Sequence, residues 1–305
     1  MLKNTKKALV FVESPFQVAN LIDLTKFQPS TKFNIYVRLN GDKKNDDAIM
    51  RKVKSCVQEN TVFRILKINK AGSKKYLQLV YLFRCITSII FSNIVIFSDD
   101  RSVIYKFLKS LAKGKIFLAD DGAYSFVKIA ELENEKNSGV IGFITRFEGL
   151  KSKKIEIINL PYKKTELKVE NYSLIIGMPL SEKGIISERD HLELILSMVK
   201  KVKVLTGNKA YYFPHRSERS YLQLDLLIIE SELSVEEYVE VVSKNAPSHI
   251  ISMYSTALFV LSSKFTGLKC FYYKINEKLI KSDEITKNIR LVYEALGSTT
   301  CKELV

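Results

Sequence analysis

The first half of the chain alternates short apolar segments with helical segments, and no other feature of the sequence constrains the fold as strongly. Strands that are separated by one helix each pair in parallel, because a parallel return requires a long connection. The segments are almost continuously apolar, which is typical of a sheet covered on both faces. The expected strands are ALVFV (8–12), NIYVRL (34–39), TVFRILKI (61–68), NIVIF (93–97) and KIFLA (115–119).

Helical segments lie between these strands. Residues 76–97 are long enough to cross a bilayer as a helix. Arg84 lies near the middle of this run, where a charge is costly in hydrocarbon, so we expect a buried helix followed by a strand. The expected helices are 15–26, 43–58, 74–90, one that begins at Ser98-Asp99 and one near Tyr124.

The second half repeats the pattern after a basic, irregular stretch. A helix is expected from Ser187, because Asp190 three residues later gives a capping-box-like start. Further helices are expected over 234–244 and 256–264. The expected strands are KIEIINLP (154–161), YSLIIGMPL (172–180), AYYFPH (210–215), LDLLIIE (224–230), SHIISMY (248–254) and KCFYYKI (269–275).

The two halves together predict an α/β protein with two Rossmann-like domains, 1–160 and 161–305, joined near 155–170. The length of 305 residues suits two domains of ordinary size. This architecture is GT-B-like: two parallel sheets face a central cleft, and ligands bind at the carboxyl ends of their strands.

The composition fits a globular protein in a reducing compartment. Hydrophobic residues make up 46% of the chain and charged residues 27%, which excludes a disordered or fibrous chain. The four cysteines are far apart and form no CxxC pair, so neither a zinc ribbon nor a disulfide framework is expected. The apolar run near the N-terminus is too short for a signal peptide, and we expect a cytoplasmic protein.

The chain is basic: 48 Lys and Arg against 33 Asp and Glu give a net charge of +15. Such a charge attracts anionic partners, including a nucleotide sugar, an anionic glycan or the inner leaflet of a membrane, where the protein would associate peripherally. No zinc finger, RNP motif or basic helix indicates specific nucleic-acid binding. The sequence leaves a homo-oligomer open.

Candidate functional residues follow the expected strands. Asp120-Asp121-Gly122 places two carboxylates at a strand end, where one could take a proton from a hydroxyl and the other raise its proton affinity. The alternative is an Asp N-cap and a turn before a helix. Asp99-Asp100 also follows a strand, and there we assign the carboxylates to helix capping.

His215 lies between Pro214 and Arg216 at another strand end, where an imidazole could donate to a phosphate oxygen. A purely structural histidine is the alternative. We expect His191 to be solvated on the polar side of its helix. His249, in an expected strand, is either structural or lines the same cleft.

Ser255-Thr256 directly precede an apolar helix. Hydroxyls and free backbone N–H groups at a helix N-terminus form an anion site that the helix dipole assists. N-capping of the helix uses the same geometry, and the sequence does not distinguish N-capping from anion binding.

Four short motifs in this order resemble those of the bacterial sialyltransferases. The resemblance is to glycosyltransferase family 52, which includes lipooligosaccharide and capsule sialyltransferases, with the polysialyltransferases as relatives. It spans residues 14 to about 263. The histidine motif of the family is usually His-Pro, whereas Arg216 follows His215 here. The motifs are SPFQ (14–17), DDG (120–122), FPHRSE (213–218) and SMYSTAL (252–258).

The resemblance implies an inverting, metal-independent transfer of sialic acid, or a related nonulosonic acid, from a CMP-sugar to a hydroxyl of a cell-surface glycan. The N-terminal domain would bind the acceptor and the C-terminal domain the donor, with no further cofactor. By analogy Asp120 is the general base, while Asp121 and Gly122 shape the turn. His215, with its neighbours Pro214 and Arg216, meets the phosphate of CMP.

The remaining residues follow from the same analogy. Ser255 and Thr256 would bind the phosphate, Ser14 and Gln17 would lie near a sugar, and Glu218 would contact the cytidine or ribose. Two alternatives remain at this point. One is a GT-B transferase with another activated sugar, such as CMP-linked legionaminic acid, pseudaminic acid or Kdo. The other is a non-catalytic basic adaptor that binds anionic polymer or membrane.

Overall fold

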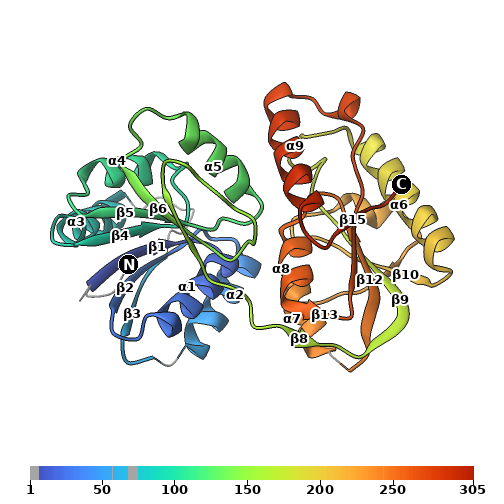
Figure 1. Ribbon diagram of the computed structural model, residues 1–305, viewed down its shortest axis with the longest axis horizontal. Helices are drawn as coiled ribbons and strands as arrows, with labels where there is room; N and C mark the ends of the chain where they lie inside the picture. The colour runs from blue at the N-terminus through green and yellow to red at the C-terminus, as the bar shows by residue number, and fades with distance from the viewer. Residues whose placement is uncertain (1–6, 57, 68–74, 243) are drawn as a thin grey trace. The chain divides into compact units, whose positions relative to one another are not determined.

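The computed structural model describes residues 7–56, 58–67, 75–242 and 244–305 (Figure 1). The chain divides into two compact units. The N-terminal unit comprises Met1–Arg146 and Leu150–Pro161, and the C-terminal unit comprises Phe147–Gly149 and Tyr162–Val305. The expected join at 155–170 contains the main boundary, which lies between Pro161 and Tyr162.

The N-terminal unit is built on one parallel sheet of seven strands, in the order β3-β2-β1-β4-β5-β6-β7. Its strands are β1 (Lys7–Val12), β2 (Lys32–Leu39), β3 (Thr61–Lys67), β4 (Ile94–Phe97), β5 (Lys115–Ala119), β6 (Val140–Thr145) and β7 (Glu156–Asn159). Its helices are α1 (Pro15–Phe27), α2 (Lys43–Ser55), α3 (Lys75–Ile90), α4 (Val103–Leu111) and α5 (Tyr124–Asn134).

The C-terminal unit contains a six-stranded parallel sheet in the order β11-β10-β9-β12-β14-β15, and β8 pairs separately with β13. Its strands are β8 (Thr165–Glu166), β9 (Val169–Ile176), β10 (Lys209–Phe213), β11 (Leu227–Ile228), β12 (Ala246–Ser252), β13 (Phe265–Thr266), β14 (Lys269–Tyr272) and β15 (Lys302–Glu303). Its helices are α6 (Glu188–Thr206), α7 (Val235–Val241), α8 (Thr256–Lys264) and α9 (Asp283–Gly297), with 3-10 turns at Ser220–Gln223 and Glu277–Leu279.

Both sheets reverse their strand order once. In the N-terminal sheet the reversal lies between β1 and β4, and in the C-terminal sheet between β9 and β12. Two parallel sheets with this doubly wound order confirm the predicted pair of Rossmann-like units. In such sheets ligands bind outside the carboxyl ends of the strands at the point of reversal, because the loops there diverge to opposite faces.

Apolar side chains cover both faces of the N-terminal sheet, as the continuous apolar strands predicted. Helices α1 and α2 pack on one face, and α3, α4 and α5 pack on the other. Phe11 of β1 is fully buried, and its ring stacks on Phe97 of β4 at 5.1 Å and on Tyr36 of β2 at 5.5 Å. These rings hold the three central strands together on the second face.

Several boundaries differ from the sequence-based expectation. The helix expected from Ser98-Asp99 begins at Val103, because the Ser102 side chain caps it by accepting from the Tyr105 backbone N–H at 3.2 Å. The segment 154–161, which the pattern grouped with the strands of the second half, supplies β7 at the edge of the first sheet. Strand β6 and helix α9 were not anticipated.

Some expectations fall on residues outside the described part of the chain. These are the N-terminal residues 1–6, residue 57 in the second expected helix, residues 68 and 74 at element ends, and residue 243 in the helix expected over 234–244. Within the described ranges, no helix combines the length and apolar character needed to cross a membrane.

Phe11→Ala should lower the free energy of unfolding of the N-terminal unit by about 3–5 kcal/mol, because it leaves a cavity beside the rings of Tyr36 and Phe97. Urea denaturation followed by far-UV circular dichroism measures this loss. Phe27→Ala, which truncates a ring that is 57% exposed, is the matched control and should change stability far less. Equal losses in both variants would contradict the packing described.

Candidate functional site

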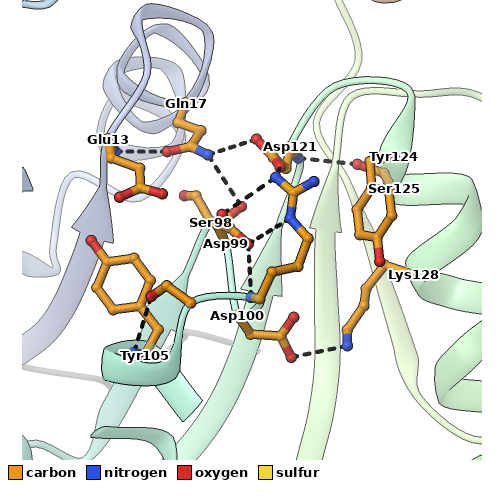
Figure 2. A network of polar contacts seen from close by, with 12 residues as sticks. Glu13, Gln17, Ser98, Asp99, Asp100, Tyr105, Asp121, Tyr124, Ser125 and Lys128 are labelled. Atoms are coloured by element: carbon orange, nitrogen blue, oxygen red, sulfur yellow. Dashed lines mark hydrogen bonds and ion pairs between the residues drawn. The ribbon is translucent and has the colours of Figure 1, made fainter. Parts of the chain in front are cut away.

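Polar side chains gather where β1, β4 and β5 end at the carboxyl edge of the N-terminal sheet (Figure 2). Gln17, on the first turns of α1, is 2% exposed and joins all three ends. Its Oε1 accepts from the Glu13 backbone N–H at 2.7 Å. Its Nε2 donates to Asp121 Oδ1 at 2.7 Å and to the Ser98 carbonyl at 3.3 Å.

Ser14 caps α1: its Oγ accepts from the Gln17 backbone N–H at 3.2 Å, and Pro15 follows at the first helical position. The resemblance implied that Ser14 and Gln17 lie beside a sugar. The Gln17 side chain is buried, and its amide holds the strand-end loops. The proximity of both residues to a sugar stays a prediction.

Asp120 and Asp121 face different surroundings, because successive side chains at a strand end point to opposite faces of the sheet. Asp121 Oδ1 accepts from Gln17 and Oδ2 pairs with Arg101, while the Asp121 backbone N–H donates to Ser125 Oγ at 3.2 Å. Gly122 follows with φ 68°, a left-handed conformation that favours glycine and permits the predicted tight turn.

Asp120 is 1% exposed. Its Oδ2 accepts from the Arg146 backbone N–H at 2.6 Å, and its Oδ1 has no hydrogen-bond partner among the described residues. Burial raises the pKa of Asp120 to about 7, although the Arg146 N–H and the side chains of Thr145 and Ser125 favour the carboxylate. The cause is therefore desolvation and not, as the sequence suggested, the neighbouring Asp121.

Asp120 borders a small cavity beneath α1. Gln17, Asn20 and Arg146 line the same cavity. The Nδ2 of Asn20, a residue that is 8% exposed, likewise has no hydrogen-bond partner among the described residues. A donor and an acceptor without partners in one cavity match the needs of a hydroxyl group or a water molecule.

Arg101 is the main cation at this edge, and sequence reasoning missed it. Its guanidinium pairs with Asp99 at 3.0 Å and with Asp121, and it lies 4.5 Å from the centre of the Tyr124 ring. Its side chain is 50% exposed, so it is accessible to an anionic group. The sequence feature that could have indicated Arg101 is the preceding pair Asp99-Asp100. We assigned that pair to helix capping, but Asp99 forms an ion pair with Arg101.

Two further carboxyls belong to this edge. Glu13, at the end of β1, pairs with Arg38 at 3.3 Å, yet burial raises its pKa to about 7. Asp100 is buried and pairs with Lys109 at 3.3 Å and Lys128 at 3.0 Å, which fixes α4 and α5 to the end of β4. Glu13 is thus a second weakly acidic group here, whereas Asp100 is structural.

In the C-terminal unit, the loop after β10 carries His215. Glu218, three residues on, is completely buried beneath it and fixes its shape. Glu218 Oε2 accepts from the His215 backbone N–H at 3.0 Å, and Oε1 accepts from Tyr212 OH at 2.5 Å. Burial raises the pKa of Glu218 to about 7. This carboxyl positions the loop, and its expected contact with a nucleotide stays a prediction.

Gly177, directly after β9, makes this arrangement sterically feasible. A Cβ at position 177 would collide with Glu218 Oε2 and with the hydroxyl of Tyr212. The sequence carries this glycine inside the segment YSLIIGMPL, where we expected a continuous strand; β9 instead ends at Ile176. The glycine is needed because the carboxyl and the phenol approach the backbone closely.

The protonation state of His215 follows from its contacts. The Ser217 backbone N–H donates to His215 Nδ1 at 3.1 Å, so Nδ1 is the acceptor and the neutral ring carries its proton on Nε2. Burial, with Arg216 and Lys183 nearby, lowers the pKa of His215 to about 4. Arg216 is exposed, so the loop offers a neutral Nε2–H donor beside a permanent cation.

His191 contradicts the expectation of a solvated side chain, because it is fully buried. Its Nδ1 lies 3.0 Å from Ser181 Oγ, and its Nε2 lies 3.5 Å from Glu218 Oε1. Burial lowers the pKa of His191. The helix face that the sequence presents as polar thus packs against the loop that carries His215.

Ser255 and Thr256 follow β12. Ser255 is the N-cap of α8, and its Oγ accepts from the Ala257 backbone N–H at 3.2 Å. Both are partly exposed. Strand β9 separates β12 from β10, which places the α8 N-terminus and the His215 loop about two strand spacings, or ~10 Å, apart at one sheet edge. His249 lies within β12, away from this edge, and its Nδ1 pairs with Ser248 Oγ at 2.8 Å.

Within the described residues, no three His, Cys, Asp or Glu side chains converge as a metal ion requires. The groups available at the two sheet edges are therefore hydrogen-bond donors, cations and isolated carboxyls.

No family model and no curated protein sequence matches the chain. Its solved structural neighbours include TcCGT1 in complex with UDP, with a TM-score of 0.57, 10% identity, and coverage of 98% of this chain and 86% of that one. MnaA of S. aureus with UDP matches with a TM-score of 0.53, 11% identity, and coverage of 96% and 87%.

A third neighbour is Alr3699/HepE of Anabaena with UDP and glucose, with a TM-score of 0.50, 11% identity, and coverage of 97% and 92%. Together with the two doubly wound sheets, these matches decide the fold. The chain has a GT-B-like fold. Identities this low concern the fold alone, and the resemblance to family 52 stays a hypothesis.

Asp120→Asn should change the pH dependence of stability. Because burial raises the pKa of Asp120, the unfolded chain ionises this carboxyl between about pH 4 and 7 while the folded chain does not, and folding stability falls across that window. The Asn side chain does not ionise, so the variant does not lose folding stability at this position as the pH rises. It should be more stable than the parent at pH 8, by about 1–3 kcal/mol, and close to it at pH 4.

Urea denaturation at both pH values measures this difference, with Asp47→Asn on the exposed face of α2 as control. A variant that lost as much stability between pH 4 and 8 as the parent would refute the assignment.

His215 should remain neutral down to about pH 4, with its proton on Nε2, because burial and Arg216 disfavour the imidazolium. Long-range nitrogen–proton correlation NMR on labelled protein reports both the tautomer and the pKa. Arg216→Gln should raise the pKa. A protonated Nδ1 at neutral pH would contradict the hydrogen bond from Ser217.

Proposed function

We propose that this protein is a glycosyltransferase that uses a nucleotide-sugar donor, and that the donor is CMP-sialic acid or a related CMP-linked nonulosonic acid. The observation that carries the proposal is the pair of anion-binding elements at one edge of the C-terminal sheet. These are the neutral His215 with its Nε2–H donor and the N-terminus of α8 with Ser255 and Thr256. Both belong to the motifs that resemble family 52.

The C-terminal unit is assigned to the donor. As the bond from the sugar to CMP breaks, negative charge grows on the phosphate. The His215 Nε2–H, the Arg216 guanidinium and the N-terminus of α8 are suited to stabilise that charge. The neutral histidine acts as a hydrogen-bond donor to the departing phosphate and keeps its proton, because loss of that proton would leave an imidazolate.

The N-terminal unit is assigned to the acceptor. A general base works best when its pKa lies near the working pH, and burial raises the pKa of Asp120 to about 7. The partnerless Oδ1 of Asp120 is the atom that would take the proton of an acceptor hydroxyl in the cavity that Asn20 shares. Asp121, with both oxygens engaged, holds the loop.

The acceptor is proposed to be a cell-surface glycan on a lipooligosaccharide or capsule precursor, and the site of reaction the cytoplasm, where nucleotide sugars are available. A donor linked to UDP is the second candidate, because TcCGT1, MnaA and Alr3699/HepE were solved with UDP. The nucleotide preference of the protein separates the two.

A thermal-shift series with CMP, UDP and GDP tests the donor. CMP should raise the melting temperature, and His215→Ala should weaken that effect because it removes a phosphate donor. Stabilisation by UDP but not by CMP would overturn the CMP proposal and favour the second candidate. No stabilisation by any nucleotide would favour a non-catalytic adaptor.

CMP release from CMP-sialic acid, with a galactose-terminated acceptor, tests the base. Asp120→Asn should reduce kcat by about 10²–10⁴, whereas CMP binding should be unchanged because the carboxyl lies in the other unit. Asp47→Asn is the control and should retain full activity. Full activity of Asp120→Asn, or the same loss of kcat in Asp47→Asn, would reject Asp120 as the base.

A further inference from the structure

Helices α3 and α4 expose an unusual amount of apolar surface. Six large side chains at the end of α3 and on α4 point to solvent, and three of them are phenylalanines. We call this surface the α3–α4 face. Its residues and exposed fractions are Phe83 (68%), Ile90 (38%), Phe91 (83%), Val103 (83%), Ile104 (38%) and Phe107 (46%).

The apolar residues form outward stripes because each helix buries a different set. Cys85 and Ile89 of α3, with Tyr105 and Leu108 of α4, pack into the same core on one face of the N-terminal sheet. Positions 83 and 90 are seven residues apart, and positions 103 and 107 are four apart, so each pair lies on one side of its helix. Since both helices cover the same sheet face, both stripes point away from the sheet.

The exposed charged residues that neighbour these stripes along the chain are basic. Arg84, Lys106, Lys113 and Lys115 are exposed. Between residues 80 and 117 the only acidic residues are Asp99 and Asp100.

Both acids are engaged at the end of β4, Asp99 by Arg101 and Asp100 by Lys109 and Lys128. Exposed phenylalanines bordered by Lys and Arg are the chemistry of an interfacial membrane anchor.

The end of α6 also exposes Val204 (81%) and Leu205 (52%) beside Lys203 but has no aromatic ring there, whereas the surface of α7 lacks the positive charge. Val241 at the end of α7 is 72% exposed, but α7 also carries Glu236, Glu237 and Glu240. That surface has the apolar side chain without the positive charge. It serves as an internal comparison for the α3–α4 face.

We propose that the α3–α4 face docks on the surface of a bilayer that contains anionic phospholipid. The phenylalanines enter the boundary between headgroups and acyl chains, and the basic side chains contact lipid phosphates. This would hold the protein where a lipid-linked acceptor lies. Only that last consequence rests on the proposed function; the docking itself does not depend on the donor.

Co-sedimentation of the full chain with vesicles tests the proposal. The protein should bind vesicles of phosphatidylcholine with phosphatidylglycerol and bind far less to phosphatidylcholine alone, and salt should weaken the binding. The combined variant Phe83→Ser, Phe91→Ser and Phe107→Ser should bind at least about tenfold more weakly. The double variant Lys106→Glu and Lys113→Glu should also bind these vesicles more weakly, because it removes the attraction to lipid phosphate.

Val241→Ser is the matched control and should bind as the parent does. The far-UV circular dichroism spectrum and the melting temperature without nucleotide should be close to those of the parent in every variant, which shows that each variant is folded and separates this test from that of the donor. Parent-like binding by the phenylalanine variant would overturn the proposal. So would a parent that ignores anionic vesicles, or one whose α3–α4 face instead joins two copies of the chain, as sedimentation equilibrium would reveal.

Discussion

The amide of Gln17 is the interaction on which the N-terminal site depends. A parallel sheet brings the carboxyl ends of β1, β4 and β5 to one edge, where backbone groups and carboxylates would otherwise be buried without partners. A single buried side chain accepts from Glu13, donates to Ser98 and donates to Asp121. Loss of that amide would leave polar groups unsatisfied in a place of low dielectric. The positions of Asp121 and Arg101 follow from it.

In the C-terminal unit a buried carboxyl, and not an amide, satisfies the polar groups at the strand end. Glu218 lies beneath the loop after β10, accepts from Tyr212 and from the His215 backbone, and requires glycine at position 177. In each unit a buried polar side chain sets the geometry of the loops at the strand ends.

The fold was largely predictable because its signals are local. Short apolar runs separated by single helices permit few arrangements other than parallel sheets, and the N-caps Ser14, Ser187 and Ser255 each open a helix where the pattern indicated. The errors arose where a pattern was ambiguous. The polar segment after β4 could cap a helix at Ser98 or at Ser102, and the choice depended on Asp99 pairing with Arg101, a contact that periodicity does not encode.

The sequence by itself determined the two parallel sheets, the strand ends that carry the polar motifs, and the left-handed turn at Gly122, since each depends on neighbours along the chain. Only the tertiary structure decided which side chains are buried. It covered Asp120 and raised its pKa, placed His191 in the interior, buried Gln17 and Glu218 beneath the loops that they support, and set His215 as a neutral donor. Burial and proton affinity arise from residues far apart in the chain, so no local pattern records them.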